Sequence, residues 1–174
     1  WGEPAGFSGH LILRYTDEID NFANAGDILG GINWPNGVLL TFQGKAHQPI
    51  ILKAASSFTS KEGAEHNFAF EAEGSDFEAM MQQTAQQWVD RLHTIDVEDE
   101  DAERINQFYG ALYRTSFLPR EMSDVDGKYP SFANGKTIKP IGSSLNDSPK
   151  YYGDFSMWDT YRAVHPLYNI IAPK

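Results

Sequence analysis

The residues best suited to chemistry lie between Tyr151 and Arg162. Five aromatic side chains lie within eleven consecutive positions there, close in sequence to two carboxylates and one guanidinium: Tyr151, Tyr152, Phe155, Trp158 and Tyr161, with Asp154, Asp159 and Arg162. Flat rings cover the apolar C–H face of a sugar, and charged groups make strong hydrogen bonds with its hydroxyl groups. This mixture favours a polyhydroxylated ligand.

The same residues also fit a structural interpretation. In that interpretation the aromatic rings belong to a buried segment, Asp159 is the N-cap of a helix, and Arg162 lies one turn later on the surface. The residue types alone leave both interpretations open.

Three phrases, in this order, resemble glycoside hydrolase family 92, the calcium-dependent exo-acting α-mannosidases. They are FYGALYRTSFLP (108–119), SDVDGKY (123–129) and YGDFSMWDTYRAVHPL (152–167). SSFTSKEGAEHNF (56–68) and the run 77–92 with Trp88 are similar to the stretch that precedes these blocks in the family, whereas the likeness is weak before residue 48.

The resemblance implies an inverting, calcium-assisted glycosidase that removes terminal α-linked mannose from mannose-containing glycans. It implies that Trp158 and Asp159, with Arg162, line the mannose pocket. The family's acid Glu and base Asp lie in later blocks, beyond residue 174. We therefore expect no catalytic residue and no calcium ligand in this chain, and no activity from the chain without the remainder of its parent. A noncatalytic carbohydrate-binding or structural module is the alternative, and a periplasmic or secreted bacterial location follows from the family alone.

Strand signals dominate the first part of the chain. Residues 9–16, 38–43 and 50–58 are apolar or β-branched enough for strands, while 17–31 is rich in Gly, Asp and Asn and predicts a loop. The fold class we expect is mixed α and β. Residues 1–74 are expected to form the C-terminal part of an antiparallel β-sandwich, and residues 75–174 connecting helices and the start of an (α/α)6 barrel, the barrel being implied by the resemblance.

Helix signals follow. The capping box Ser75–Glu78 starts a helix over 77–92, and a second helix is predicted from about Asp99 to Leu118 after a strand-like stretch, Thr94–Val97. On the helical stripe, Trp88 is expected in the core and not as a ligand platform. Three further regions are less regular. The pattern over 60–72 fits either a helix or a strand, and 122–149 is predicted to be a long loop with a hairpin around Gly135. The last helix begins near Trp158 and must kink or break at Pro166.

Composition limits the partners. The net charge of −10 without any run of Lys or Arg argues against nucleic acid, and no apolar run is long enough to span a membrane. The absence of cysteine excludes disulfides and thiolate chemistry. The chain starts at Trp1 without a signal peptide and stops just after an apolar helical turn, which predicts a piece of a longer protein that exposes apolar surface when alone.

Two acidic clusters invite a calcium reading. The run DVEDEDAE (96–103) better fits the first turn of a helix, and the spacing of Asp124 and Asp126 is wrong for a complete calcium loop and favours an Asx turn. The five histidines have no metal-ligand spacing. We assign no metal ligand, and we leave Asp124 and Asp126 without a role.

Overall fold

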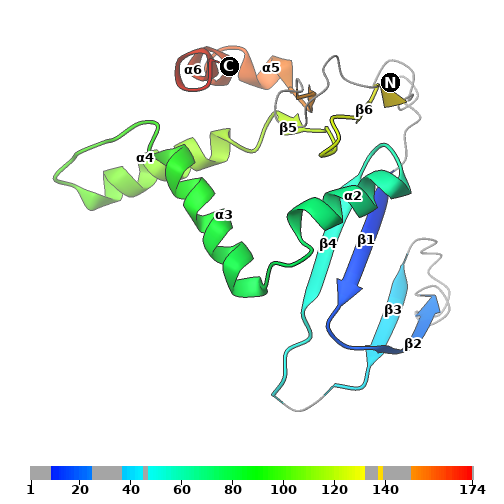
Figure 1. The fold of residues 1–174 in the computed structure, drawn as a ribbon. Coiled ribbons are helices and arrows are strands. Elements are labelled where there is room, and N and C mark those ends of the chain that lie inside the picture. The colour runs from blue at the N-terminus through cyan, green and yellow to red at the C-terminus, as the bar shows by residue number, and fades with distance from the viewer. Residues whose placement is uncertain (1–8, 25–36, 45–46, 132–136, 139–149, 174) are drawn as a thin grey trace.

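The computed structural model describes residues 9–24, 37–44, 47–131, 137–138 and 150–173. Strands occupy the beginning of the chain and helices the rest, with short strand pairs between α4 and α5 (Figure 1). The mixed α and β class is therefore confirmed. The described strands form two-stranded antiparallel sheets.

The first four strands form a nested arrangement, in which the pair β2–β3 lies between β1 and β4 in the sequence. Strand β1 (His10–Tyr15) pairs with β4 (Leu52–Ser57) in the register His10↔Ser57 to Tyr15↔Leu52, and β2 (Ile19–Asn24) pairs with β3 (Val38–Phe42). The three predicted strands are confirmed. The loop predicted over 17–31 is wrong in part, because β2 lies within it; side-chain alternation is weak there and the pairing with β3 supplies the order.

Helix α2 (Lys61–Glu71) settles the ambiguous region 60–72 as a helix. Ser60 is its N-cap and accepts a 2.9 Å hydrogen bond from Gly63 N. Ala64 and Phe68, four residues apart, are buried where α2 covers β1 and β4, whereas Phe70 is 68% exposed. The first described helix thus begins well before Ser75.

Helices α3 (Phe77–Leu92) and α4 (Ala102–Thr115) confirm the two central predictions. The cap of α3 is Asp76, one residue later than the start of the predicted box, and its carboxylate accepts from Ala79 N at 2.7 Å. The helices pack through Trp88, whose ring centroid lies 4.4 Å from that of Tyr113. The predicted strand over 94–97 is wrong: these residues belong to the connection between the helices, and no described strand pairs with them.

Short strands organise the long loop. Strand β5 (Arg120–Glu121) pairs with β8 (Tyr152–Gly153), and β6 (Tyr129–Pro130) pairs with β7 (Thr137–Ile138). The β6–β7 pairing agrees with the predicted hairpin, although Gly135 itself lies outside the described residues.

The last helical region is broken in two, as Pro166 predicts. Helix α5 (Met157–Thr160) ends before the turn 161–163, and α6 (Val164–Ile171) places Pro166 in its first turn. A backbone N–H at that position has no intrahelical acceptor, so proline loses nothing there.

Much apolar surface remains uncovered. Leu11, Leu52, Phe22 and Val38 on the strands are 61%, 53%, 74% and 66% exposed, and Phe77 and Met81 on α3 are 56% and 54% exposed. This confirms the expected exposure. Among the described helices none has the length and apolarity needed to cross a membrane.

Candidate functional site

Residues Tyr151–Arg162, called the aromatic strip below, run from β8 into α5. The strip turns sharply after β8, where Asp154 and Ser156 have φ of 58° and 43°. Non-glycine residues rarely adopt this left-handed conformation, and it occurs preferentially where the surrounding structure holds the chain. The turn brings α5 to the surface immediately after the strand.

The predicted site residues lie together on and just after α5. Trp158 is 85% exposed, and Asp159 is also exposed while its Oδ2 accepts a 2.7 Å hydrogen bond from Ser156 Oγ. Arg162 donates from Nε to its neighbour Tyr161 at 2.7 Å and lies over that ring. In the described part of the chain, no hydrogen bond or ion pair joins Arg162 to Asp159.

The structure changes the capping interpretation of Asp159. Ser156 occupies the N-cap position of α5, and Asp159 is the third helical residue. The interpretation of Asp159 as the N-cap is therefore wrong, because the left-handed Ser156 starts the helix earlier. The Asp159 carboxylate accepts a hydrogen bond from the Ser156 hydroxyl, and its remaining lone pairs are available to solvent.

The beginning of the aromatic strip is fixed by the segment 120–129. Tyr151 N donates to Ser123 Oγ at 2.7 Å, and Met122 N donates to Tyr151 O at 2.8 Å. The rings of Tyr151 and Tyr129 stack with centroids 4.3 Å apart and an interplanar angle of 9°. Further along, the Arg120 guanidinium donates to Asp154 Oδ2 at 2.8 Å. The strip thus has a defined position relative to the SDVDGKY block.

The end of the strip is tied to the helices. Thr160 Oγ1 lies 2.8 Å from His165 Nε2, which joins α5 to α6. The Tyr168 hydroxyl on α6 donates to Leu118 O at 2.8 Å and also to Thr115 O at the end of α4. These contacts hold the strip at both ends.

Asp124 is the most highly connected carboxylate in the described residues, and its connections were not predicted. It is 6% exposed and accepts 2.8 Å hydrogen bonds from Ser57 Oγ and Asn67 Nδ2 and a further bond from Thr59 Oγ1. These four residues form what we call the Asp124 junction. The partners precede Asp124 by at least 57 residues, so no local spacing indicated them.

Asp126 behaves as the sequence predicts. Its Oδ1 accepts from Lys128 N at 3.1 Å, which is an Asx turn, and its Oδ2 pairs with Lys128 Nζ. Partial burial raises the pKa of Asp126, but the hydrogen bonds and charge of Lys128 outweigh burial and hold the pKa below its ordinary value. The same hydrogen bond raises the pKa of Lys128.

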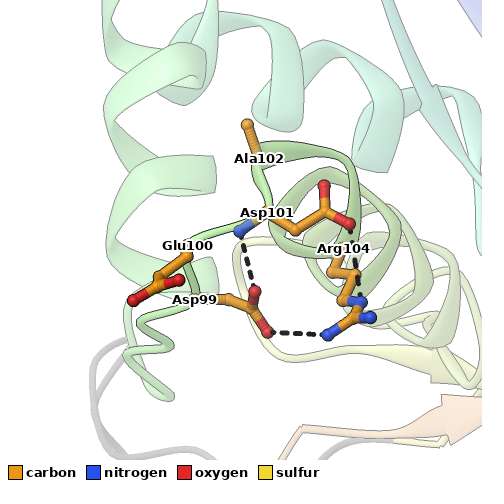
Figure 2. Close-up of a pocket in the computed structure, with 5 residues that line it drawn as sticks. All are labelled: Asp99, Glu100, Asp101, Ala102 and Arg104. Atoms are coloured by element: carbon orange, nitrogen blue, oxygen red, sulfur yellow. Dashed lines mark hydrogen bonds and ion pairs between the residues drawn. The ribbon is translucent and has the colours of Figure 1, made fainter.

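Two hollows elsewhere offer less chemistry. One, of about 680 Å³, lies at the start of α4 and is lined by Asp99, Glu100, Asp101, Ala102 and Arg104 (Figure 2). Two of its three carboxylates are already engaged: Asp99 accepts from Asp101 N at 2.8 Å, Asp101 accepts from Glu103 N at 2.9 Å, and both lie near the Arg104 guanidinium. The predicted helix start is confirmed, with Asp101 as the N-cap.

The second hollow, of about 550 Å³, lies between β4 and α3 and is mainly apolar. Trp88 lines it while packing against Tyr113, so this tryptophan belongs to the helix interface. The wall has few hydrogen-bonding groups for a sugar.

The described residues do not fit a calcium site. In the ranges that the structure describes, no three His, Asp or Glu side chains are arranged so that they could hold a metal ion. The Asp124 oxygens already accept hydrogen bonds from two hydroxyl groups and one amide group.

Comparisons with known proteins identify a family and similar folds. The glycosyl hydrolase family 92 catalytic domain matches residues 63–174. The fold is similar to that of the family GH92 inverting mannosidase BT2199 from Bacteroides thetaiotaomicron, with a TM-score of 0.76 and 26% identity over 95% of this chain and 23% of that chain. It is also similar to the family GH92 α-mannosidase BT3965 from the same species, with a TM-score of 0.72 and 22% identity over 92% of this chain and 22% of that chain.

A third similar structure is the GH92 family glycosyl hydrolase ccman5, with a TM-score of 0.69 and 24% identity over 78% of this chain and 17% of that chain. No curated protein matches the sequence. The chain spans less than a quarter of the solved structures that it resembles. Because the family match covers more than half of its residues, the chain belongs to glycosyl hydrolase family 92 and is a part of that family's catalytic domain.

Proposed function

We propose that this chain is the part of an α-mannosidase that supplies one wall of the pocket for the terminal mannose. The observation that carries the proposal is the exposed Trp158 beside the exposed carboxylate of Asp159, both on an α5 that is fixed at each end. Because contacts before and after α5 hold its backbone, the positions open to its side chains are limited, which reduces the entropy lost on binding a sugar.

The roles follow from the side chains. The Trp158 ring covers the apolar C–H face of the mannose, and Asp159 accepts hydrogen bonds from its hydroxyl groups. Arg162 donates to a hydroxyl or orients Tyr161, on which it lies. Inversion needs a general acid and a general base about 6.5–9.5 Å apart, and we place both, with the calcium ligands, in the remainder of the parent chain.

The uncovered apolar faces support the proposed architecture. Exposed leucines on β1 and β4 fit one sheet of a β-sandwich that lacks its facing sheet, and exposed residues of α3 fit the start of an (α/α)6 barrel. We keep the domain boundary at 74/75 as part of this proposal. A bacterial periplasmic or secreted enzyme remains the prediction from the family.

The proposal is tested with Asp159→Asn in the complete gene product. An ionised acceptor in a desolvated pocket contributes on the order of 1.5–3 kcal/mol, so kcat/KM toward an α-mannoside should fall at least about tenfold. The thermal midpoint should hardly change, because the side chain is exposed and Asn can still accept the Ser156 hydroxyl.

Two results would contradict the proposal. If Asp159→Asn keeps the wild-type kcat/KM, the aromatic strip does not form part of the mannose pocket. A complete gene product that binds mannosides without hydrolysing them would favour the noncatalytic carbohydrate-binding module.

A further inference from the structure

We propose that Asp124 is a positioning residue: its buried carboxylate fixes the aromatic strip relative to β4 and α2. The consequence for sugar binding rests on the proposed function, whereas the consequence for the strip's position does not. The observations come from two sides of the same short segment, Met122–Asp124.

The first side of the segment faces the beginning of the chain. Asp124 accepts from Ser57 at the end of β4, from Thr59 before α2, and from Asn67 within α2. The loop between β5 and β6 accordingly lies beside α2 in Figure 1. Three donors on one buried carboxylate lock this loop onto the β4–α2 corner.

The Asn67 amide strengthens the lock because its orientation is determined. Its Nδ2 also donates to Ser56 O at 2.8 Å, while its Oδ1 accepts from Val125 N at 2.9 Å. If the amide were flipped, its NH₂ group would face the N–H of Val125, and its oxygen would face the Asp124 carboxylate, which would lose the Asn67 donor. The junction therefore requires an acceptor-only group at position 124.

The close approach of α2 shows how tightly the junction is built. A Cβ at Gly63 would lie 2.5 Å from Asp124 Oδ2 and 2.7 Å from Ser57 Oγ. No side chain other than hydrogen fits between the helix and the carboxylate.

The second side of the segment holds the aromatic strip. Ser123 and Met122, directly before Asp124, make the hydrogen bonds to Tyr151 that align β8. The turn at Asp124–Gly127 is closed by Gly127 N donating to Asp124 O at 2.8 Å, and it leads to Tyr129, whose ring stacks on Tyr151. A movement of Asp124 would therefore shift β8 through Met122 and Ser123 and through the ring of Tyr129.

Asp124 and Asp126 differ in the distance along the chain to their hydrogen-bond partners. Both are carboxylates of the same loop, but the partner of Asp126 is Lys128, two residues away. Asp126→Asn is therefore a matched control that changes the same charge in the same loop without touching β4 or α2.

The test compares amide hydrogen exchange and kinetics in the complete gene product. In Asp124→Asn the new amide NH₂ faces either the Asn67 NH₂ or the two hydroxyl donors, so the hydrogen bonds of the Asp124 junction weaken. We expect exchange in peptides covering 150–162 to rise at least about tenfold, with α4 unchanged, because opening is confined to the released segment. KM for an α-mannoside should rise more than kcat falls, since a displaced wall binds the sugar less well.

A further variant keeps the test decisive. Thr59→Val removes one donor at nearly constant shape and should give a smaller rise of the same kind if Asp124→Asn does not fold.

The proposal is overturned if Asp124→Asn leaves exchange over 150–162 at the wild-type level, or raises it equally in α4 and in the Asp126→Asn control. If the strip loosens while KM and kcat are unchanged in an active enzyme, the positioning role of Asp124 stands, and the consequence for sugar binding is overturned together with the proposed pocket role of the strip. If the wild-type protein hydrolyses no α-mannoside, the proposed function fails, while the exchange comparison still decides whether Asp124 positions the strip.

Discussion

Asn67 Nδ2 and Asp124 Oδ1 lie 2.8 Å apart although 57 residues separate them in the chain. Both side chains are buried, at 7% and 6% exposure. A hydrogen bond to a charged group contributes about 1.5–3 kcal/mol, more than a typical neutral bond. This contact therefore joins the helix that covers β4 to the loop that holds β8.

The tight packing at Gly63 makes an unusual prediction for a helix glycine. Alanine favours a helix by up to about 1 kcal/mol over glycine. At Gly63, however, the added methyl would displace the Asp124 carboxylate, and overpacking costs about 1–3 kcal/mol in addition to weakened hydrogen bonds. We expect Gly63→Ala to destabilise the complete protein by about 1–3 kcal/mol, measured by denaturant unfolding.

Gly110→Ala in α4 is the matched control. A Cβ there would meet only the end of the flexible Arg114 side chain at 3.4 Å. We expect this change to be neutral or to stabilise by up to about 1 kcal/mol. Equal effects of the two substitutions would show that the close approach at Gly63 does not matter for stability.

The two tryptophans should separate packing from binding. Trp88 packs on Tyr113 and Phe117, so Trp88→Ala should lower stability by about 1–3 kcal/mol, given its partial burial. Trp158 is 85% exposed, so Trp158→Ala should change stability by less than about 0.5 kcal/mol. Its kcat/KM toward an α-mannoside should fall at least about tenfold through loss of the stacking surface.

Thermal melting and kinetics on both variants provide the measurement. A large loss of stability in Trp158→Ala with unchanged kinetics would indicate that this ring is covered by the rest of the parent protein. The ring would then have a packing role.

The Asp126–Lys128 pair predicts a pH-dependent stability difference. Because the folded pKa of Asp126 lies below its ordinary value of 3.8, the carboxylate stabilises the fold fully above that value. The contribution is lost as the pH falls through the folded pKa. Asp126→Asn should therefore be less stable than wild type by up to about 1 kcal/mol near pH 7, and the difference should shrink below about pH 4.

Denaturant unfolding of both proteins across this range measures the difference. Lys128→Gln should show the same dependence, because it removes the partner that lowers the pKa. A difference that grows on acidification would contradict the sign of the shift.

Local sequence determined the central helices. Asp76 and Asp101 cap α3 and α4, and apolar residues recur at helical spacing along both helices. Pro166 likewise predicts the break between α5 and α6. These features depend on residues within a few positions of one another, so the chain contains the information locally.

The resemblance, and not the spacing of charges, selected Trp158, Asp159 and Arg162. The structure adds that all three are exposed and that Ser156, in place of Asp159, is the helix cap. Their contact with mannose stays a prediction.

Strand pairing and the Asp124 junction were decided by tertiary structure alone. The sequence predicts β1 and β4 as strands, but their register depends on α2 covering one face of the pair. The SDVDGKY block contains two carboxylates, Asp124 and Asp126, with similar neighbours in sequence. Asp126 accepts a hydrogen bond within its own turn, whereas Asp124 accepts hydrogen bonds from Ser57, Thr59 and Asn67. Because hydrogen bonds act over about 3 Å and depend on direction, only the folding of α2 against β4 brings those donors to one carboxylate.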